Sequence, residues 1–500
     1  MIIPEITAAE AASQIEHGAL IGVGGFGPAG SPKYIIPQLA QRARQEHAAG
    51  RPFKVSVVTG ASIGASCDGE LAEADAIDRR FPFSVNAQLR QAFNTGRVRY
   101  NDLNLSDNAS HLRQGVTGQI DWGIIEACDV QEIHGRVRIY LTAGIGIAPT
   151  ICRLAKNGVF IELNAWHSTR LIGMHDIYEI EAPWFRSPVR ITQPVEHIGM
   201  PYIETTPDRI RGIVYTNAPD EAREMLPATP ATLQIGQNLA DFLVWNMKQG
   251  YIFKDRLTLQ SGVGSAANAV VGALGSQPEV PNFNIYTEVL QEEPLRLIRE
   301  GRITAASTGA LTISSTHLKD LYENIDQYRG RLLLRPSEIS NCPEIIARLG
   351  ICSINTAIEV DIYGHVNSTK ICGSKMMNGV GGSADFTCNA MLATFTCAST
   401  TKDGRISSIV PFCSHVDHTE HYVDAIVTEY GVADLRNKCA TERAEAIIAI
   451  AHPDYRPILR EYLRIAQQGG GHTPHALSKA FAMHEAYMKK GDMRLTSFED

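Results

Sequence analysis

The chain has 500 residues, of which 44% are hydrophobic and 20% are charged. These proportions are those of an ordinary folded enzyme and exclude a disordered or coiled-coil chain, and at about 150 residues per domain the length predicts more than one domain. The net charge is −8 and no basic run is present, which argues against nucleic acid or an anionic membrane as a partner.

The first residues do not predict a signal peptide, and an early helix is expected. Met1 to Glu5 lacks the positive charges that open a signal peptide. Thr7 to Glu10 has the spacing of a capping box and predicts a helix that ends near Gly18. A strand is predicted over residues 19–23.

A glycine-rich turn, residues 22–27, follows that strand and matches the dinucleotide-binding pattern G-x-G-x-x-G. Ser31 and Pro32 are the expected N-cap and first residue of the next helix. In a dinucleotide site an acid about 20 residues further on should meet the ribose, but Glu46 lies in the polar tail of the same helix. An NAD(P)-dependent oxidoreductase is therefore only a remote alternative.

Strand-like runs alternate with helical patterns along the whole chain, which predicts open α/β sheets. Pro219, Pro227 and Pro230 lie among polar residues and mark a boundary. We therefore predict an α/β chain with two domains, 1–225 and 226–500. The remaining predicted strands are 55–58, 122–126, 138–142, 159–163, 257–259, 303–306, 331–334 and 354–360, and two late helices are predicted over 434–450 and 477–490.

A second glycine turn, residues 262–264, lies between a predicted strand and an Ala-rich helix. Main-chain N–H groups and the helix dipole at such a junction favour an anion. The alternative is simple close packing of the strand against the helix.

Glu288 is the candidate nucleophile. Alternating apolar residues in 284–291 predict a buried strand that runs into this acid, and a carboxylate on a rigid strand end can attack a carbonyl. The loop NGVGGSADF at 378–386 contains a Gly-Gly pair whose N–H groups can approach a reacting carbonyl closely. Together they predict acyl transfer through a glutamyl intermediate, with a structural acid as the alternative for Glu288.

Seven segments resemble the acetyl-CoA hydrolase/transferase family, within the family I CoA-transferases of the succinyl-CoA:acetate and propionyl-CoA:succinate type. They occur in order over nearly the whole chain. The segments are GGFGPAGSPK at 24–33, YTEVLQ at 286–291, SNCPEIIARLG at 340–350, INTAIEVDIYGHVNST at 354–369, NGVGGSADF at 378–386, GRISSIVPFCSHVDHTEH at 404–421 and TEYGVADLR at 428–436.

The resemblance implies two related open α/β CoA-transferase-type domains with the active site between them. It implies that Glu288 is the nucleophile, that the Asn341 amide lies beside it, and that the N–H of Gly382 holds the oxyanion. It places Glu429 near the site without a stated role, and it gives the turn at 22–27 a place in the acyl pocket. The residues it implies for coenzyme A contact are Gly262, Val263, Gly264, Ser265, Ala266, Ala267, Ile358, Asn378, Gly382 and Lys402.

The expected activity is that of an acyl-CoA:carboxylate CoA-transferase. It would move CoA between acetate, propionate, butyrate or succinate, through an acyl-glutamyl anhydride and a glutamyl-CoA thioester on Glu288. Coenzyme A is then a co-substrate, and no permanently bound cofactor is expected. An acyl-CoA hydrolase of the same fold is the alternative, because it would share every motif. We also expect a homodimer.

Histidine and cysteine patterns do not predict a metal. His415, His418 and His421 are spaced i, i+3, i+6, unlike the i, i+4 pair of a helical zinc site. The ten cysteines are scattered without a C-x-x-C pair, which is typical of reduced thiols in a cytoplasm. No apolar stretch reaches the length of a membrane span.

Overall fold

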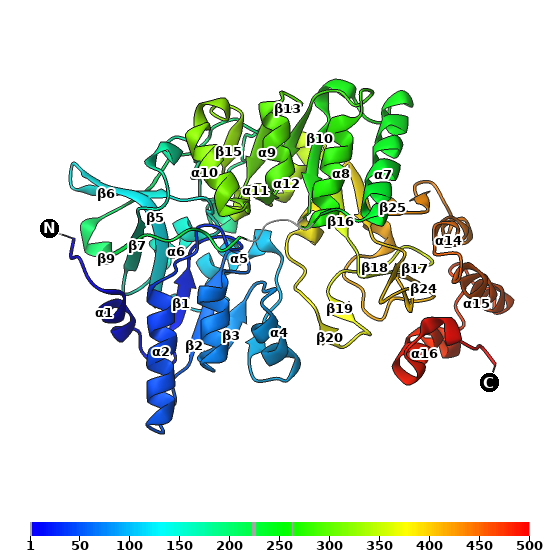
Figure 1. Cartoon of the computed structure of the whole chain (residues 1–500), viewed down its shortest axis with the longest axis horizontal. Helices are drawn as coiled ribbons and strands as arrows, with labels where there is room; N and C mark the ends of the chain where they lie inside the picture. The colour runs from blue at the N-terminus through cyan, green and yellow to red at the C-terminus, as the bar shows by residue number, and fades with distance from the viewer. Residues whose placement is uncertain (1–2, 223–226, 263, 500) are drawn as a thin grey trace. The chain divides into compact units, whose positions relative to one another are not determined.

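The computed structural model describes residues 3–222, 227–262 and 264–499 of a mixed α/β protein (Figure 1). It divides into two compact units. Unit 1 comprises Met1–Met225, Asn284–Leu349 and Asn378–Asp385, and unit 2 comprises Leu226–Phe283, Gly350–Met377 and Phe386–Asp500.

This division differs from a single boundary between residues 225 and 226, because two later segments belong to unit 1. Backbone hydrogen bonds explain the first of them. The N–H of Leu311 donates to Ala143 O at 2.9 Å, and the N–H of Ile145 donates to Gly309 O at 3.0 Å. Glu288, Asn341 and Gly382 therefore lie in the same unit as the N-terminal segment.

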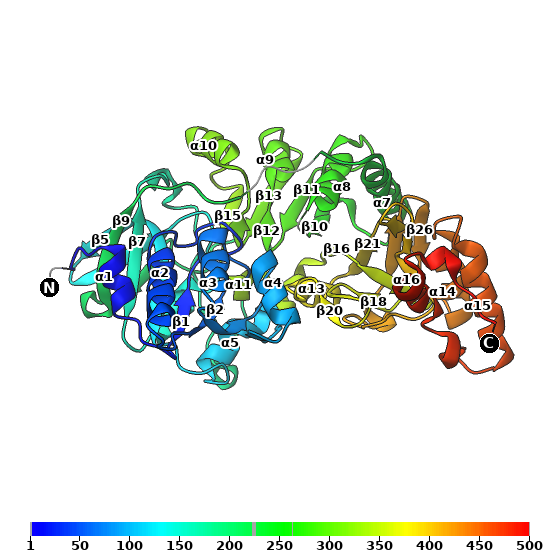
Figure 2. The same ribbon diagram turned by 60° about the horizontal axis from the view of Figure 1, so that its bottom comes forward.

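The main sheet of unit 1 has nine strands. Five parallel strands lie side by side in the order β4-β3-β2-β1-β5. Strand β5 also pairs with β6, which is antiparallel to it, and with β7, which is parallel. Strand β6 pairs in turn with antiparallel β8, and β7 with parallel β9. Figure 2 shows α1, α2, α3 and α4 in a row along these strands. The strands predicted near 19–23, 55–58, 122–126, 138–142 and 159–163 are confirmed. The bounds are β1 Leu20–Val23, β2 Val55–Thr59, β3 Ile77–Phe81, β4 Arg99–Tyr100, β5 Trp122–Ile133, β6 Arg136–Leu141, β7 Val159–Asn164, β8 Ile203–Thr205 and β9 Ile210–Thr216, with α1 Ala8–Ser13, α2 Ile35–Ala48, α3 Glu70–Glu73, α4 Ala87–Asn94, α5 Leu105–Arg113 and α6 Ala148–Leu154.

The capping box at Thr7 is confirmed: its hydroxyl accepts from the N–H of Glu10, whose carboxylate accepts from the N–H of Thr7. The predicted N-cap at Ser31 and first helical residue at Pro32 are wrong, because the N-cap of α2 is Tyr34 and the helix begins at Ile35. The Glu162 carboxylate of β7 accepts from the N–H groups of residues 33, 34 and 35 at 2.7, 2.9 and 2.7 Å. A side chain distant in sequence thus supplies the cap.

The second segment of unit 1 carries short strands and helices around residue 288. Parallel pairs join β13 to β15 and β12 to β14. The strands predicted at 303–306 and 331–334 are confirmed. The bounds are β11 Phe283–Tyr286, β12 Val289–Leu290, α9 Glu292–Arg299, β13 Ile303–Thr308, β14 Ala310–Leu311, α10 Ser315–Glu323, β15 Leu332–Leu334, α11 Ser337–Ser340 and α12 Pro343–Leu349.

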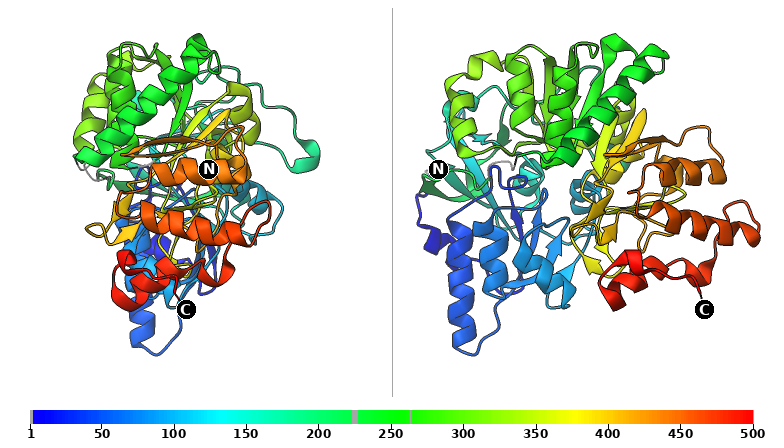
Figure 3. Two further views of the ribbon diagram at one scale, coloured as in Figure 1. Left: turned by 90° about the vertical axis from the view of Figure 1, so that its right-hand side faces the viewer. Right: turned by 45° about the vertical axis from the view of Figure 1, so that its right-hand side comes forward.

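Unit 2 contains the strand order β10-β16-β21-β25-β26, parallel except for β26. The helices α7 and α8 pack closely, since a Cβ on Gly236 would lie 3.3 Å from Val270 Cα. Figure 3 shows α14, α15 and α16 stacked in that order in orange and red. The bounds are α7 Pro230–Lys248, β10 Thr258–Ser261, α8 Ser265–Ser276, β16 Cys352–Thr356, β17 Glu359–Asp361, β18 Val366–Asn367, β21 Leu392–Thr396, β22 Thr400–Thr401, β23 Ile406–Ser407, β24 Ile409–Val410, β25 Ala425–Thr428, β26 Gly431–Asp434, α14 Ala440–Ala449, α15 Arg456–Gln468 and α16 Ala482–Lys490.

Three predicted elements of unit 2 differ in extent. The strand predicted over 354–360 is two strands, because β17 leaves β16 to pair with β18 and β24. The helix predicted over 434–450 begins at Ala440, since Asp434 ends β26. The last helix begins at Ala482 after a 3-10 turn. Of the helices within the described ranges, none is both long and apolar enough to cross a membrane.

Candidate active site

Glu288 lies on a bend between β11 and β12 and is partly buried. Its main-chain oxygen accepts from the N–H of Gly309 at 3.0 Å and from the hydroxyl of Thr308 at 3.2 Å. Beside it, the N–H of Thr287 donates to Ser307 O at 3.0 Å. These bonds fix the main chain on both sides of the carboxylate, so the side chain starts from a rigid position.

Asn341 reaches the Glu288 carboxylate from the end of α11. Its Nδ2 lies 3.0 Å from Glu288 Oε2, and the Asn341 side chain is fully buried. The residue caps α11, with its N–H donating to Ser337 O at 2.9 Å, so a helix end holds the amide in place. The structure therefore brings Asn341 and Glu288 together.

Gly382 packs against the same carboxylate and amide. A Cβ built on Gly382 would lie 1.9 Å from Glu288 Oε2 and 2.2 Å from Asn341 Nδ2, so no larger residue fits without displacing them. The loop before it is anchored to the N-terminal segment, because the N–H of Val380 donates to Asp102 Oδ1 at 3.0 Å. Glu288, Asn341 and Gly382 thus form one site within unit 1.

Burial dominates the electrostatics of this site. Removal from water raises the pKa of Glu288, and the hydrogen bond from Asn341 lowers it in part. Asp385 lies beside the pair, with Oδ2 3.2 Å from Asn341 Nδ2. Burial, together with the Glu288 charge, raises the pKa of Asp385 to about 7 against the hydrogen bonds from Ser106 and Asn341.

Sequence reasoning missed Asp385 and Ser106. Asp385 stands in the quoted NGVGGSADF segment, three residues after Gly382, so its place in that motif was the available signal. Ser106, on α5, donates from its N–H and its hydroxyl to Asp385 at 3.1 and 2.6 Å. No sequence pattern connects residues so far apart.

The residues expected to contact coenzyme A lie in unit 2, apart from Asn378 and Gly382. Gly262 donates its N–H to Ile354 O at 3.0 Å, and Gly264, at φ 117°, precedes α8. Val263 lies outside the described residues, Ser265 and Ala266 begin α8, and Ala267 is buried.

The other residues expected to contact coenzyme A are Ile358, Lys402 and Asn378. The N–H of Ile358 donates to Asn367 O at 2.8 Å, so that group already pairs within unit 2. Lys402 is exposed at the turn between β22 and β23. The side chain of Asn378 donates to Gly379 O at 3.0 Å in unit 1. Their role toward coenzyme A stays a prediction.

The glycine turn at 22–27 does not offer a dinucleotide site at its helix. A pyrophosphate would need the free N–H groups where α2 begins, and Glu162 already accepts from the N–H groups of residues 33, 34 and 35 there. The turn closes on itself, with the N–H of Phe26 donating to Ala29 O at 2.9 Å. A Cβ on Gly24 would lie 3.1 Å from Ile125 Cγ2 and one on Gly25 would lie 2.7 Å from Ser31 N, so close packing accounts for these two glycines, and the place of the turn in an acyl pocket stays a prediction.

The three histidines of 415–421 form no metal-ligand group among the described residues. His415 Nε2 lies 3.1 Å from Asp417 Oδ1, and His421 is exposed. His418 is buried, and burial lowers its pKa to about 4. Glu429 accepts from the N–H and hydroxyl of Ser399 at 2.9 and 2.5 Å within unit 2.

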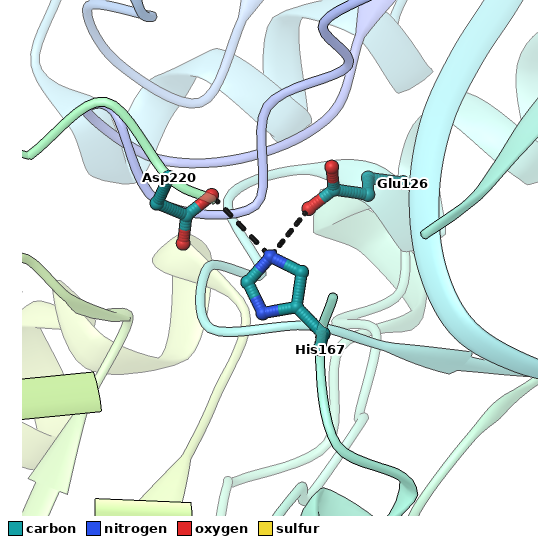
Figure 4. A group of neighbouring side chains, drawn as sticks. All are labelled: Glu126, His167 and Asp220. Carbon is teal, nitrogen blue, oxygen red and sulfur yellow. Dashed lines mark ion pairs between the residues drawn. The ribbon is translucent and has the colours of Figure 1, made fainter. Parts of the chain in front are cut away.

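A buried charge cluster that the sequence did not reveal lies elsewhere in unit 1. His167 Nε2 points between Glu126 and Asp220, at 3.2 and 3.5 Å from their oxygens (Figure 4). The three ligand atoms lie within 4.8 Å of one another, as in a metal site. However, Lys33 Nζ lies 2.6 and 3.0 Å from the same two carboxylates. Two cations therefore balance two anions, and we interpret the cluster as a structural ion-pair network.

Family models match two parts of the chain. The acetyl-CoA hydrolase/transferase N-terminal domain matches residues 4–214, and the C-terminal domain of the same family matches residues 318–463.

Similar proteins match over nearly the full length. Propanoyl-CoA:succinate CoA transferase of Escherichia coli is 44% identical, covering 98% of each chain. Succinyl-CoA:acetate CoA-transferase of Clostridium kluyveri is 43% identical over 98% of this chain and 90% of its own, and acetyl-CoA hydrolase of Schizosaccharomyces pombe is 38% identical over 96% and 94%. Among solved structures, RipA from Yersinia pestis shares the fold at a TM-score of 0.69 and 23% identity, covering 92% of this chain and 96% of its own.

The charge cluster predicts a pH-dependent stability. Asp220 and Glu126 raise the pKa of His167 to about 9 against the effect of its burial. Because the folded pKa is above the ordinary value, this stabilisation is present below about pH 6.5 and is lost as the pH rises through about 9, on the order of 3 kcal/mol in all. Urea unfolding at about pH 6 and about pH 9.5 should show this loss in the wild type and a much smaller loss in His167→Gln.

His421→Gln is the matched control, because its side chain is 76% exposed. Its stability should follow the wild type at both pH values. An equal loss in wild type and His167→Gln would show that His167 is not charged in the folded protein.

Proposed function

Because the chain belongs to the acetyl-CoA hydrolase/transferase family, we propose that it is an acyl-CoA:carboxylate CoA-transferase in which Glu288 carries first the acyl group and then CoA. It is an enzyme of the CoA-transferase family. The single observation that supports the proposed site most strongly is the 3.0 Å contact between Asn341 Nδ2 and Glu288 Oε2, against which Gly382 packs.

Glu288 has the properties that covalent catalysis needs. Its main chain is fixed by residues 307–309, and its carboxylate is withdrawn from water. Burial raises its pKa, which makes the ionised oxygen more basic and more nucleophilic than a solvated carboxylate. One oxygen is held by Asn341, which leaves the other to attack a carbonyl.

The proposed reaction has four exchanges at three carbonyl carbons, those of the donor acid, of Glu288 and of the acceptor acid. The Glu288 oxygen attacks the acyl-CoA carbonyl and expels CoA thiolate, leaving an acyl-glutamyl anhydride. The thiolate attacks the glutamyl carbonyl and expels the first carboxylate, leaving a glutamyl-CoA thioester. The second carboxylate then reverses both steps and restores Glu288. No proton is gained or lost overall.

Each step passes through a tetrahedral oxyanion. The Asn341 N–H is directed at the glutamyl carboxyl, so it is placed to stabilise the oxyanion that forms on that carbon. The N–H of Gly382 is the proposed second donor. One such donor is typically worth about 3–4 kcal/mol of barrier.

Coenzyme A is the proposed co-substrate, and its contacts with residues 262–267, Ile358, Asn378 and Lys402 are part of this proposal. Acetate, propionate, butyrate and succinate are the proposed acids, and the names of the two bacterial relatives support succinate and short acyl groups. A cytoplasmic homodimer also belongs to the proposal. All ten cysteines are free thiols, as a reducing compartment requires.

A hydrolase is the second candidate, because the relative from Schizosaccharomyces pombe is named acetyl-CoA hydrolase. The two activities share the thioester on Glu288 and differ in whether a carboxylate or water attacks it.

The covalent intermediate is directly testable. Acyl-CoA without an acceptor should add the mass of CoA, less water, to the peptide that contains Glu288, and borohydride should reduce the thioester and inactivate the enzyme. Glu288→Gln keeps the shape of the side chain but should abolish both labelling and transfer.

Glu300→Gln, an exposed residue at the end of α9, should retain full labelling and is the control. Reproducible labelling of another residue in the wild type would refute the assignment.

The close contact of Gly382 with Glu288 and Asn341 predicts that a larger residue at position 382 lowers kcat. In Gly382→Ala the new Cβ must displace the Glu288 carboxylate and the Asn341 amide. A displacement of about 1 Å can cost on the order of 100-fold in rate, so kcat should fall by about that factor, with a smaller change in the KM for acyl-CoA.

Gly469→Ala is the control, since that glycine has no positive φ and its Cβ would lie 3.4 Å from Ala466 O. If both alanine variants turn over like the wild type, Gly382 does not border the reacting groups.

Kinetics separate the transferase from the hydrolase. A transferase should show ping-pong behaviour, with parallel lines in double-reciprocal plots of acyl-CoA against acetate or succinate. Release of CoA should be negligible until a small carboxylate is added. Free CoA released from acetyl-CoA at full speed without an acceptor would establish the hydrolase instead.

A further inference from the structure

The Asn341 amide lies between the carboxyl group of Glu288, which is partly buried, and that of Asp385, which is buried. Its Nδ2 is 3.0 Å from Glu288 Oε2 and 3.2 Å from Asp385 Oδ2. Asp385 is only 4% exposed, and no step of the proposed exchange uses it. A buried acid beside a nucleophile is costly unless it has a role in the site.

The contacts fix the orientation of the amide. The hydroxyl of Ser340 donates to Asn341 Oδ1 at 2.8 Å, so the carbonyl end is satisfied. The two hydrogens of Nδ2 then serve one carboxyl each. Rotation of the amide by half a turn would place its oxygen against both carboxyl groups, which is repulsive. Asp385 therefore helps to keep the N–H directed at Glu288.

Asp385 is itself held by a distant element. Ser106, on α5, donates to it from both its N–H and its hydroxyl, at 3.1 and 2.6 Å. Asp385 thus links α5 to the amide that contacts Glu288, entirely within unit 1.

Glu288 is the main charged neighbour of Asp385. Among the groups acting on Asp385, the Glu288 charge is the largest Coulombic contribution. Arg113 of α5 pairs with Glu338 of α11, so these two charges compensate each other, and Asp102 accepts from the N–H of Val380. Asp107 and His111 of α5 are partly exposed to solvent.

We propose, on the basis of the nucleophilic role proposed for Glu288, that Asp385 is a positioning residue: it orients the Asn341 amide and shares it with Glu288 as an electrostatically coupled pair of carboxyl groups. The coupling has a consequence for the reaction. When Glu288 becomes an anhydride or a thioester, it loses its negative charge, and the repulsion on Asp385 ends. Asp385 then binds its proton less tightly and releases it, and it takes a proton up again when Glu288 is regenerated.

Proton release is the most specific test. The chemical exchange is proton-neutral, so a proton released on mixing with acyl-CoA comes from the enzyme. Because the pKa of Asp385 is about 7, it is about half protonated at about pH 7, and a part of that proton, up to about half an equivalent, should appear in a weakly buffered indicator assay as the thioester forms. Asp385→Asn should form the thioester without this release.

Two variants separate charge from orientation. Asp385→Asn keeps an oxygen toward Asn341 but removes the charge, so turnover should stay within about threefold while the acid limb of the kcat/KM profile moves to lower pH, because Glu288 loses a like-charged neighbour. Asp385→Ala removes the acceptor, so kcat should fall roughly 10- to 100-fold with little change in the KM for acyl-CoA. Asp326→Asn, with a 74% exposed side chain, should match the wild type in every assay.

Ser106→Ala provides an independent variant if Asp385→Ala does not fold. The hydroxyl of Ser106 lowers the pKa of Asp385, so its loss should move the proton-release curve to higher pH. Mass spectrometry of the wild type distinguishes the two proposals. Absence of a Glu288 thioester would refute the proposed function itself. A thioester without proton release, or an Asp385→Asn profile equal to the wild type, would refute the role of Asp385 alone.

Discussion

The hydrogen bond from Asn341 to Glu288 is the interaction on which the rest of the site depends. A carboxylate taken out of water loses its hydration and tends to bind a proton, which would end its use as a nucleophile. The Asn341 amide donates a hydrogen bond to the carboxylate and carries no charge. The carboxylate can therefore ionise, and it is not held so strongly that it loses its nucleophilicity. An arginine in the same place would hold the oxygen more tightly and lower its reactivity.

Three different contacts fix the groups that surround this hydrogen bond. The main chain of Glu288 is held by backbone pairing with residues 307–309, the amide by the end of α11, and the glycine loop by Asp102. Each contact fixes a main-chain position next to a reacting group, so the reacting atoms keep their positions while charges move. Such preorganisation is what lowers barriers when the chemistry only exchanges similar bonds.

Local patterns in the sequence predicted the local structure. The capping box at Thr7, the buried strand before Glu288 and the parallel strands of the main sheet all depend on neighbours in the chain. The sequence could not show the cap of α2 by Glu162 or the charge cluster around Lys33, because the contacts of Lys33 with Glu162 and Glu126 join residues 129 and 93 positions apart. The hydrogen bond from Ser106 to Asp385 could not be predicted for the same reason. The motifs identified Glu288, Asn341 and Gly382 as candidates, and only the fold shows that they meet.

Unit 1 is assembled from three stretches of chain, of which the last ends at Asp385. During synthesis the first stretch leaves the ribosome long before its partners exist, and at about 5–20 residues per second the delay is on the order of ten seconds. The main chain of residues 143–145, which later pairs with residues 309–311, is therefore without these partners in that interval. A protein whose active site is completed this late in synthesis needs its first half to be protected from aggregation in the cell. Its yield on expression should therefore be limited by the length of that interval rather than by the free energy of unfolding of the complete fold.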